Sequence, residues 1–308
     1  MSNLTMQAVR FHEYGGPEVL VLEQAPRPQP QADQVLIRVL AAGVNPADAA
    51  MRAGYFKEFM PLTLPWVPGF EGAGIVQAAG ENVTAFQPGQ GVFGFVAGGY
   101  AEYAVAAASE VQPKPAHLTF EEAATVPMGA LVAWQAVIET ANVQTGQRVL
   151  VHGAAGGVGL YAVQLAKWKG AHVIGTSSGG NSEFVRSLGA EAIDYNTTPF
   201  ETVVRDVDVV VDTVGGQVIE HSWQVLRPNG ILVTIAGRLA PEAGLAHGVR
   251  AASAGRGAPE KLKEIAELLE ARQLTPAIRT RFTLAEARQA QELAQTKHGR
   301  GRIILLTA

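Results

Sequence analysis

The stretch between positions 148 and 167 constrains the fold of this chain more than any other part of it. It reads Arg-Val-Leu-Val-His-Gly-Ala-Ala-Gly-Gly-Val-Gly and continues as Leu-Tyr-Ala-Val-Gln-Leu-Ala-Lys. The branched apolar run at 149–151 is typical of a buried strand, and apolar residues then recur at helical spacing from Leu160 onward. The glycines between the two patterns predict a tight turn. We therefore expect a strand, a turn and a helix in immediate succession.

The turn matches the spacing that binds a dinucleotide. Small residues stand at Ala154, Gly156 and Gly159, where they let the backbone turn sharply, approach a pyrophosphate and pack the helix on the strand. The free N–H groups at the start of the helix then face the anion. A purely structural turn is the alternative, and it fits this context less well. The residues expected to line the cofactor here are Gly153, Ala154, Ala155, Gly156, Gly157, Val158 and Gly159.

Strand and helix patterns alternate from this turn onward. The strand patterns occupy 148–152, 171–176, 191–194, 207–212 and 230–236. The helical patterns occupy 157–169, 181–188, 199–204 and 216–226. Such alternation predicts a doubly wound parallel sheet of the α/β class, with right-handed connections and a ligand over the carboxyl ends of the strands.

The first 120 residues have a different texture. Short strand patterns, separated by turns rich in proline and glycine, lie at 6–11, 19–23 and 34–41. They predict a small antiparallel β domain, which a helical section from 120 to 140 joins to the rest. Strand patterns of the same kind return at 279–284 and 302–306. We therefore expect a β domain formed by 1–122 and 276–308, and an α/β domain formed by 123–275.

Composition excludes several classes of function. Of the 308 residues 47% are hydrophobic and 17% charged, which is enough apolar content for a large core. A net charge of −4 without a basic run argues against nucleic-acid binding. The lack of cysteine excludes disulfides, thiolate zinc sites and a cysteine nucleophile. Since neither a signal-peptide core nor an apolar run of ~18 residues is present, we expect a cytoplasmic protein without a membrane partner.

The end of the second strand of the α/β domain bears on the choice of cofactor. An NAD site usually has Asp or Glu there, about 20 residues past the glycines, to bind the ribose 2′-hydroxyl. Positions 173–178 contain no acid, and an acid would repel the 2′-phosphate of NADP. The pattern favours NADP over NAD, although the nearest basic residue, Arg186, is also consistent with a solvated helix face. The small polar residues expected to contact the cofactor are Thr176, Ser177, Ser178 and Asn181.

A turn and a short helix at 42–52 hold two polar residues, Asn45 and Asp48. Their position is typical of a helix N-cap, which is worth about 1 kcal/mol. The same position also allows both side chains to lie beside a substrate. The spacing favours the cap and leaves the functional interpretation open.

Four motifs are informative when taken together. They are Ala42-Gly-Val-Asn-Pro-Ala-Asp48, Val67-Pro-Gly-Phe-Glu-Gly-Ala-Gly74, the strand and turn at 149–159, and Ala192-Ile-Asp-Tyr195. They stand in the order seen in medium-chain dehydrogenase/reductases, which this chain resembles over essentially its whole length. The branch it resembles is that of the zinc-independent quinone oxidoreductases and the related enone and alkenal reductases. The resemblance implies a GroES-like β domain, a Rossmann domain, an active site in the cleft between them, and a homodimer or homotetramer.

The resemblance also bears on metal binding, because zinc alcohol dehydrogenases of this family bind the metal through a Cys and a His of the first domain. The Cys position lies near Asn45 here, and the Gly-His-Glu motif has become Gly69-Phe70-Glu71. Phe70 cannot ligate a metal, and the histidines show no paired ligand spacing. We therefore expect no metal site. The histidines stand at positions 12, 117, 152, 172, 221, 247 and 298.

The resemblance implies roles for residues on the substrate side. By the family pattern, Asn45 approaches the nicotinamide, and Asp48 and Tyr55 line the space for the substrate. Glu71 is implied as a structural partner within the wall of the cleft. Relatives often carry Thr where this chain has Val132, so a hydroxyl near the nicotinamide carboxamide is expected to be absent.

Further residues are implied on the cofactor side. Tyr195 packs at the adenine-ribose end in the family pattern. Met128 either touches the nicotinamide ring or fills the core, and the sequence favours neither interpretation. The loops after the fourth and fifth parallel strands should edge the cofactor, and they contribute Val214, Gly215, Ala236 and Gly237.

The resemblance implies an enzyme that transfers hydride from NADPH to a quinone or a similar conjugated carbonyl compound, without zinc. Reduction of the double bond of an enone or alkenal is the alternative within the same chemistry. A protein that binds NADPH as a sensor or structural ligand, without turnover, is the alternative of another class.

Overall fold

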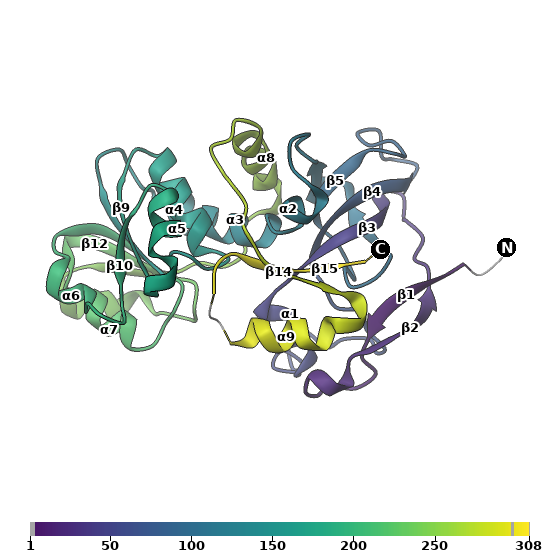
Figure 1. The fold of residues 1–308 in the computed structure, drawn as a ribbon, viewed down its shortest axis with the longest axis horizontal. Helices are drawn as coiled ribbons and strands as arrows, with labels where there is room; N and C mark the ends of the chain where they lie inside the picture. The colour runs from purple at the N-terminus through teal and green to yellow at the C-terminus, as the bar shows by residue number, and fades with distance from the viewer. Residues whose placement is uncertain (1–3, 297–298, 308) are drawn as a thin grey trace.

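The computed structural model describes residues 4–296 and 299–307. Figure 1 shows two bodies side by side: one contains the first strands of the chain together with the yellow C-terminal segment, and the other contains the teal and green segments between them. The first body is built on an antiparallel sheet and the second on a parallel sheet. The predicted α/β class, an antiparallel β domain beside a doubly wound parallel sheet, is confirmed.

The antiparallel body is organised around its longest strand, β3 (Gln34–Val44). Its other strands are β1 (Thr5–Arg10), β2 (Val21–Pro26), β4 (Glu71–Ala79), β5 (Gly91–Phe95), β6 (Tyr103–Ala107), β7 (Val111–Pro113), β14 (Ile278–Thr283) and β15 (Arg302–Leu306). In the described part of the main sheet the order is β14-β15-β3-β4-β5-β7, with β6 also paired to β3, while β1 pairs with β2. β3 exceeds the predicted range 34–41 because its last residues pair with β15, as Val44 does with Ile303.

The C-terminal segment returns to this first sheet, as the sequence predicted. β15 pairs with β3 and β14 pairs with β15. Two helices belong to the same body, α1 (Pro46–Arg52) and α9 (Ala287–Gln295). They are joined by a buried hydrogen bond of 2.8 Å from Nε of Arg52 to Gln291. The domain boundaries themselves, 1–122 with 276–308 and 123–275, stay a prediction.

The parallel body consists of β8 (Arg148–His152), β9 (His172–Ser177), β10 (Glu191–Asp194), β11 (Val207–Asp212), β12 (Leu226–Thr234) and β13 (Arg250–Ser253). In space the strands follow the order β10-β9-β8-β11-β12-β13. The helices between them are α4 (Gly159–Trp168), α5 (Ser182–Ser187), α6 (Phe200–Val203) and α7 (Gln217–Ser222). The central strands β8 and β11 are nearly continuous runs of buried valine and leucine, because helices cover both faces of such a sheet.

Two details of this sheet differ from the prediction. The helix expected at 216–226 ends at Ser222, and the next strand begins at Leu226 rather than at 230. The helix ends early because the chain turns into the sheet there: Val225 accepts a hydrogen bond from the N–H of Val207, and Leu226 pairs with Val207 of β11. β13 was not predicted, because a strand of four residues with two alanines carries little sequence signal.

Helices between the two sheets connect the bodies. They are α2 (Phe120–Ala124), α3 (Pro127–Trp134), the π-helical turn η3 (Gln135–Thr140) and α8 (Leu262–Glu270). The helical section predicted at 120–140 is divided at Pro127, which has no N–H to continue α2. Almost every residue of α3 is buried. A Cβ on Gly129 of α3 would collide with the carbonyl of Gly157, so α3 packs directly on the glycine-rich turn. No helix in the described part of the chain is both long and apolar enough to cross a membrane.

Candidate active site

The glycine-rich turn after β8 has the geometry that its sequence predicts. Gly153 has a φ of 67°, a left-handed conformation that favours glycine. A Cβ on Gly159 would collide with the carbonyl oxygen of Gly153, so only glycine lets α4 begin this close to the turn. The predicted succession of strand, turn and helix is confirmed.

The turn leaves room for a phosphate group. Around a Cβ placed on Gly180 or Gly237, no described atom beyond the adjacent residues lies within 4 Å, and around one on Gly156 the carbonyl oxygen of Gly153, at 3.2 Å, is the nearest such atom. No other side chain covers the backbone at these three positions, whereas Gly157 and Gly159 are closely packed. Because peptide N–H groups at a helix N-terminus bind pyrophosphate, the residues present fit a dinucleotide.

Asp212, at the end of β11, organises both loops that were expected to edge the cofactor. Its side chain is fully buried. Oδ1 accepts hydrogen bonds from the backbone N–H of Val214 at 2.9 Å and of Gly215 at 3.0 Å. Oδ2 accepts a bond of 2.6 Å from the hydroxyl of Thr234, which in turn accepts one of 3.1 Å from the N–H of Ala236. Sequence reasoning missed Asp212, although an acid at the end of a buried valine run signals such a role.

His152 joins the ends of two parallel strands. Its Nδ1 lies 3.0 Å from the hydroxyl of Thr176 on β9, and its Nε2 lies 3.0 Å from the hydroxyl of Ser222. Burial lowers the pKa of His152 to about 4, so the ring is neutral at physiological pH. Its role is to hold Thr176, one of the expected cofactor contacts, at the edge of the sheet.

The expected ribose end contains an acid that sequence reasoning missed. Asp194 on β10 lies opposite Ser177 on β9, and a Cβ on Gly179 would collide with its carboxylate. The side chain of Asn181 donates a hydrogen bond of 3.0 Å to Ser178. Tyr195 follows Asp194 and is half exposed. β9 itself carries no acid, as the sequence shows, but the neighbouring parallel strand brings one beside it.

Asn45 lies in a buried polar network rather than serving only as a cap. It precedes α1 at the N-cap position. Its Nδ2 donates a hydrogen bond of 2.8 Å to Oε1 of Glu71, and its Oδ1 accepts one of 2.8 Å from Arg302. The side chain is only 2% exposed. The amide therefore has a fixed orientation, set by one acid and one base.

Glu71 and Arg302 form the centre of this network. They make a buried ion pair, and Oε2 of Glu71 accepts a hydrogen bond of 2.7 Å from the backbone N–H of Met128 at the start of α3. The stem of Arg302 packs on the turn, since a Cβ on Gly157 would lie 2.6 Å from its Cδ. Glu71 was expected as a structural partner. Arg302 was missed, and a base directly before an apolar strand was its only signal.

Asp48 adds a second buried acid next to this network. Its Oδ2 accepts hydrogen bonds from the N–H of Asn45 at 2.8 Å and from the hydroxyl of Tyr100 at 2.9 Å. Its buried Oδ1 has no hydrogen-bond partner among the described residues. Burial, and to a smaller extent the charge of Glu71, raise the pKa of Asp48 to about 7. The same burial and the proximity of Asp48 raise the pKa of Tyr100.

The other expected residues lie in different environments. Tyr55, in the segment after α1, is 77% exposed, and the hydrogen bonds described for the buried network do not include it. Met128 is partly buried and packs against the core, while its backbone N–H reaches Glu71. Val132 is buried in α3.

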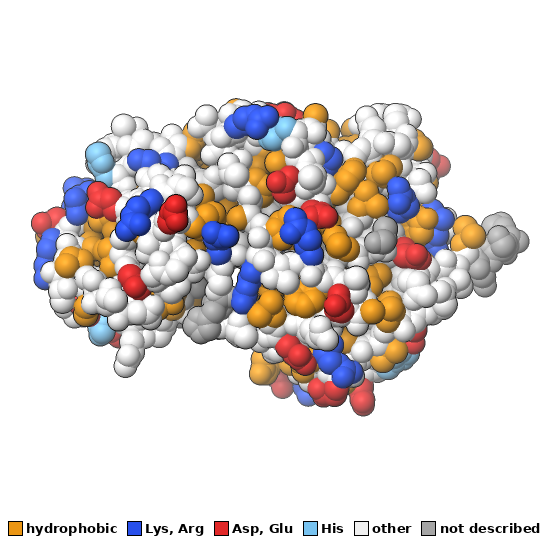
Figure 2. Space-filling view, viewed as in Figure 1, with side chains coloured by type: hydrophobic (Ala, Val, Ile, Leu, Met, Phe, Trp, Pro, Cys, Tyr) orange, Lys and Arg blue, Asp and Glu red, His pale blue; other side chains and the backbone are white. Residues whose placement is uncertain are grey.

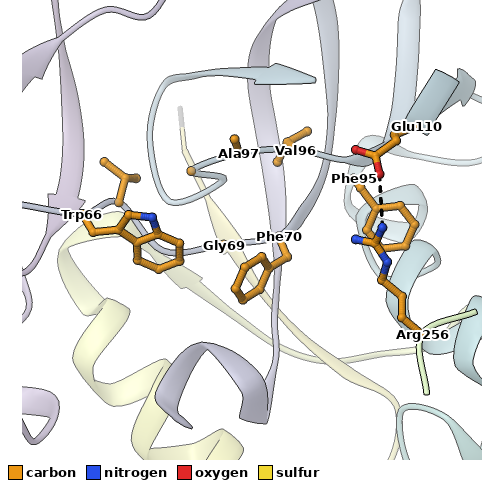
Figure 3. A pocket seen from close by; sticks show the side chains of 10 residues that line it. Trp66, Gly69, Phe70, Phe95, Val96, Ala97, Glu110 and Arg256 are labelled. Carbon is orange, nitrogen blue, oxygen red and sulfur yellow. Dashed lines mark hydrogen bonds and ion pairs between the residues drawn. The ribbon is translucent and has the colours of Figure 1, made fainter. Parts of the chain in front are cut away.

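A cavity of about 360 Å³ begins one residue away from Glu71. Figure 3 shows Trp66 and Phe70 on one side of it, and Phe95 with the ion pair of Glu110 and Arg256 on the other. Its walls are mainly apolar and aromatic, which is typical of small-molecule sites. The lining residues are Trp66, Val67, Gly69, Phe70, Phe95, Val96, Ala97, Gly98, Glu110 and Arg256.

Two further observations concern metals and charge. Within residues 4–296 and 299–307, no group of three or more His, Cys, Asp or Glu side chains could hold a metal ion. On the face drawn in Figure 2, basic and acidic side chains are interspersed over both bodies. Nucleic-acid binders typically carry a stripe of one sign instead.

Comparison with known proteins agrees with this architecture. Residues 31–116 match the alcohol dehydrogenase GroES-like domain, and residues 188–305 match the zinc-binding dehydrogenase family. The chain is 33% identical to the quinone oxidoreductase of Mus musculus, over 96% of each chain. It is 34% identical to the 2-methylene-furan-3-one reductase of Solanum lycopersicum, over 97% of this chain and 79% of that protein.

A solved structure extends the comparison to three dimensions. The quinone oxidoreductase of Coxiella burnetii superposes with a TM-score of 0.88 at 33% identity, covering 99% of this chain and all of that one. Identity at this level over nearly the whole length, together with the two-body fold and the glycine-rich turn, shows the family. The chain belongs to the medium-chain dehydrogenase/reductases, and it is an oxidoreductase related to quinone oxidoreductases and enone reductases.

Proposed function

We propose that this protein reduces quinones, or similar conjugated carbonyl compounds, with a hydride from NADPH and without a metal. The observation that carries the proposal is the contact between the buried network and the glycine-rich turn. Arg302 packs on Gly157 and binds Asn45, so the amide of Asn45 lies close to the glycine-rich turn at 153–159, the proposed dinucleotide cradle. The aromatic cavity begins beside the same network at Phe70. A cofactor in the cradle and an acceptor in the cavity would therefore meet near Asn45.

The chemistry requires positioning more than acid–base catalysis. When bound, the nicotinamide supplies the hydride. A quinone takes up one hydride and one proton to give the hydroquinone, and the proton can come from solvent. The chain orients the reactants and excludes water. Proximity and orientation of this kind can contribute several kcal/mol, up to about 7–11 in well-aligned systems. Asn45, Asp48 and Tyr55 are the side chains that we propose for the substrate side.

We propose NADPH as the preferred cofactor. β9 ends in the small polar residues Thr176 and Ser177 and then Ser178, and no acid follows the strand directly. The cradle at 153–159, Asn181, Tyr195, Met128 and the loops at 214–215 and 236–237 complete the proposed cofactor site. The carboxylate of Asp194, beside Gly179, would oppose a 2′-phosphate, and its replacement therefore tests this choice.

We propose that catalysis needs no zinc, since the sequence contains no cysteine and has Phe70 at the position of the family's histidine ligand. We also propose a homodimer or homotetramer, the assembly that the resemblance implies, and a cytoplasmic location. The acceptor is a small molecule in this scheme, and neither nucleic acid nor a membrane takes part.

A specific observation favours a second candidate, reduction of an enone or alkenal double bond. The tomato relative, 34% identical, is named a 2-methylene-furan-3-one reductase. Hydride would then go to the β carbon of the conjugated carbonyl, and a solvent proton would complete the saturated product.

The test is the oxidation of NADPH and of NADH, followed at the nicotinamide absorbance. The acceptors are 1,4-naphthoquinone and a short enal, each with and without a chelator. Chelator-resistant oxidation of NADPH with the quinone supports the proposal. Turnover of the enal alone supports the second candidate. Tight binding of NADPH with no turnover of either acceptor would support a non-catalytic sensor and reject both enzymatic schemes.

A further inference from the structure

Arg256 places a fixed cation on the wall of the aromatic cavity. It belongs to the segment between β13 and α8, whereas the other lining residues belong to the antiparallel body. Its guanidinium carbon lies 4.5 Å from the centre of the Phe95 ring. Its Nη2 lies 3.1 Å from Oε1 of Glu110. Figure 3 shows this stack and ion pair closing one side of the cavity, with Trp66 and Phe70 across from them.

The guanidinium of Arg256 has N–H donors available for a ligand. Arginine carries five N–H donors in a planar fork and stays charged at any physiological pH. One contact to a single carboxylate oxygen leaves donors available, and the side chain is 41% exposed. Because Glu110 neutralises the net charge, the pair suits an uncharged ligand with a strong acceptor oxygen better than it suits an anion. A carbonyl oxygen is such a group.

We propose that Arg256 is a specificity-determining residue that donates a hydrogen bond to an oxygen of the acceptor and so favours quinones over alkenals. This inference rests on the proposed function. The cavity of about 360 Å³ is large enough for a planar quinone ring, and in this scheme one of the two quinone oxygens accepts the hydrogen bond from Arg256. An alkenal has one oxygen and no ring, so it gains little from a cation on the far side of an aromatic cavity.

The experiment compares kcat/KM of the full-length protein for 1,4-naphthoquinone and for 2-hexenal, with NADPH saturating. The variants are Arg256→Gln, Arg256→Lys, Glu110→Gln and, as a matched control, Arg281→Gln. Arg281 makes a similar half-exposed ion pair, with Glu121, outside the cavity. The KM for NADPH and the melting temperature of each variant show whether the cradle and the fold are intact.

Arg256→Gln should lower kcat/KM for the quinone about tenfold to a hundredfold, the range of a hydrogen bond from a charged donor. The loss for the enal should be less than about threefold, and the KM for NADPH should stay within twofold. Arg256→Lys should recover part of the quinone activity because it keeps the charge. Glu110→Gln should affect both acceptors alike and less than Arg256→Gln does for the quinone. Arg281→Gln should change neither activity.

Two results would overturn the inference, and they differ from failure of the proposed function. In the first, Arg256→Gln loses as much kcat/KM for the enal as for the quinone, and Glu110→Gln loses the same amount as Arg256→Gln. This result would show that the ion pair only joins the two bodies. Quinone activity unchanged in a folded Arg256→Gln would remove the residue from recognition. If the wild-type protein reduces the enal but no quinone, the proposed function fails, and this inference fails with it.

Discussion

Replacement of Glu71 by Gln should destabilise this protein far more than a typical Glu→Gln change. Glu71 is fully buried and accepts hydrogen bonds from three groups, the guanidinium of Arg302, the amide of Asn45 and the N–H of Met128. Gln has one acceptor oxygen and one NH₂ donor. If the oxygen of this Gln faces Arg302 and Asn45, its NH₂ group faces the N–H of Met128, so that two donors meet without an acceptor. If the amide is turned the other way, the NH₂ group faces the donors of Arg302 and Asn45 instead.

The magnitude follows from the burial of the partner. Arg302 is only 6% exposed, so Gln at position 71 leaves a buried cation without its counterion. Breaking a buried pair in this way costs about 3–5 kcal/mol, compared with a total stability of about 5–15 kcal/mol for most proteins. For a protein of this size 1 kcal/mol shifts the melting temperature by about 2 °C. We therefore expect Glu71→Gln to melt ~6–10 °C lower than the wild type.

Scanning calorimetry of three variants measures this effect. Glu121→Gln is the matched control, because it removes the same charge from an exposed pair with Arg281 and should cost about 1 kcal/mol at most. The double variant Glu71→Gln/Arg302→Met removes the stranded cation, so it should melt several degrees above Glu71→Gln. A fall of less than 2 °C in Glu71→Gln, or a double variant that melts lower than the single one, would refute the assignment of a buried ion pair.

The remaining predictions concern two other acids. Burial raises the pKa of Asp48 from 3.8 to about 7, so the folded protein keeps a proton that the unfolded chain releases. Stability from this source is fully present below pH ~4 and is lost as the pH rises to about 7, a change of about 4 kcal/mol at most. In Asp48→Asn the unfolding free energy should lack this decline, and identical pH profiles for the two proteins in urea titrations would contradict the shift. Asp194→Asn removes the carboxylate beside Gly179, and should lower the Kd for NADPH about threefold to tenfold while leaving that for NADH nearly unchanged. Equal changes for both cofactors in fluorescence titrations would place Asp194 away from the 2′ position.

The parts of this site that the sequence predicted are those set by short-range constraints. The strand, turn and helix at 148–167 depend on neighbouring residues alone, because glycine is required at Gly153 for its φ and at Gly159 for lack of space. The loops after β11 and β12 follow from the alternation of strands and helices. Such features need no knowledge of what lies across the sheet.

The residues that were missed act over long distances in the sequence. Arg302 reaches Glu71 across 231 positions, and Tyr100 reaches Asp48 across 52. Asp194 lies beside Ser177, at the proposed ribose end, only because β10 pairs in parallel with β9. A single sequence shows that these residues are polar, but it does not show which buried partner satisfies them. The same reason explains why β3 is longer than predicted, since its end is defined by β15.

The C-terminal strand explains why this chain needs both of its bodies to form one site. β15 adds to the first sheet next to β3, yet its first residue, Arg302, packs on Gly157 of the second body and binds Glu71 and Asn45 of the first. One residue earlier, the N–H of Gly301 donates a hydrogen bond of 2.8 Å to the carbonyl of Ala155 in the glycine-rich turn. The orientation of Asn45 and the position of the turn are thus fixed by the same two residues. Any shift between the bodies would disturb the packing of Arg302 on Gly157 and the hydrogen bond from Gly301 to Ala155, so these two contacts set the distance between the glycine-rich turn and the buried network.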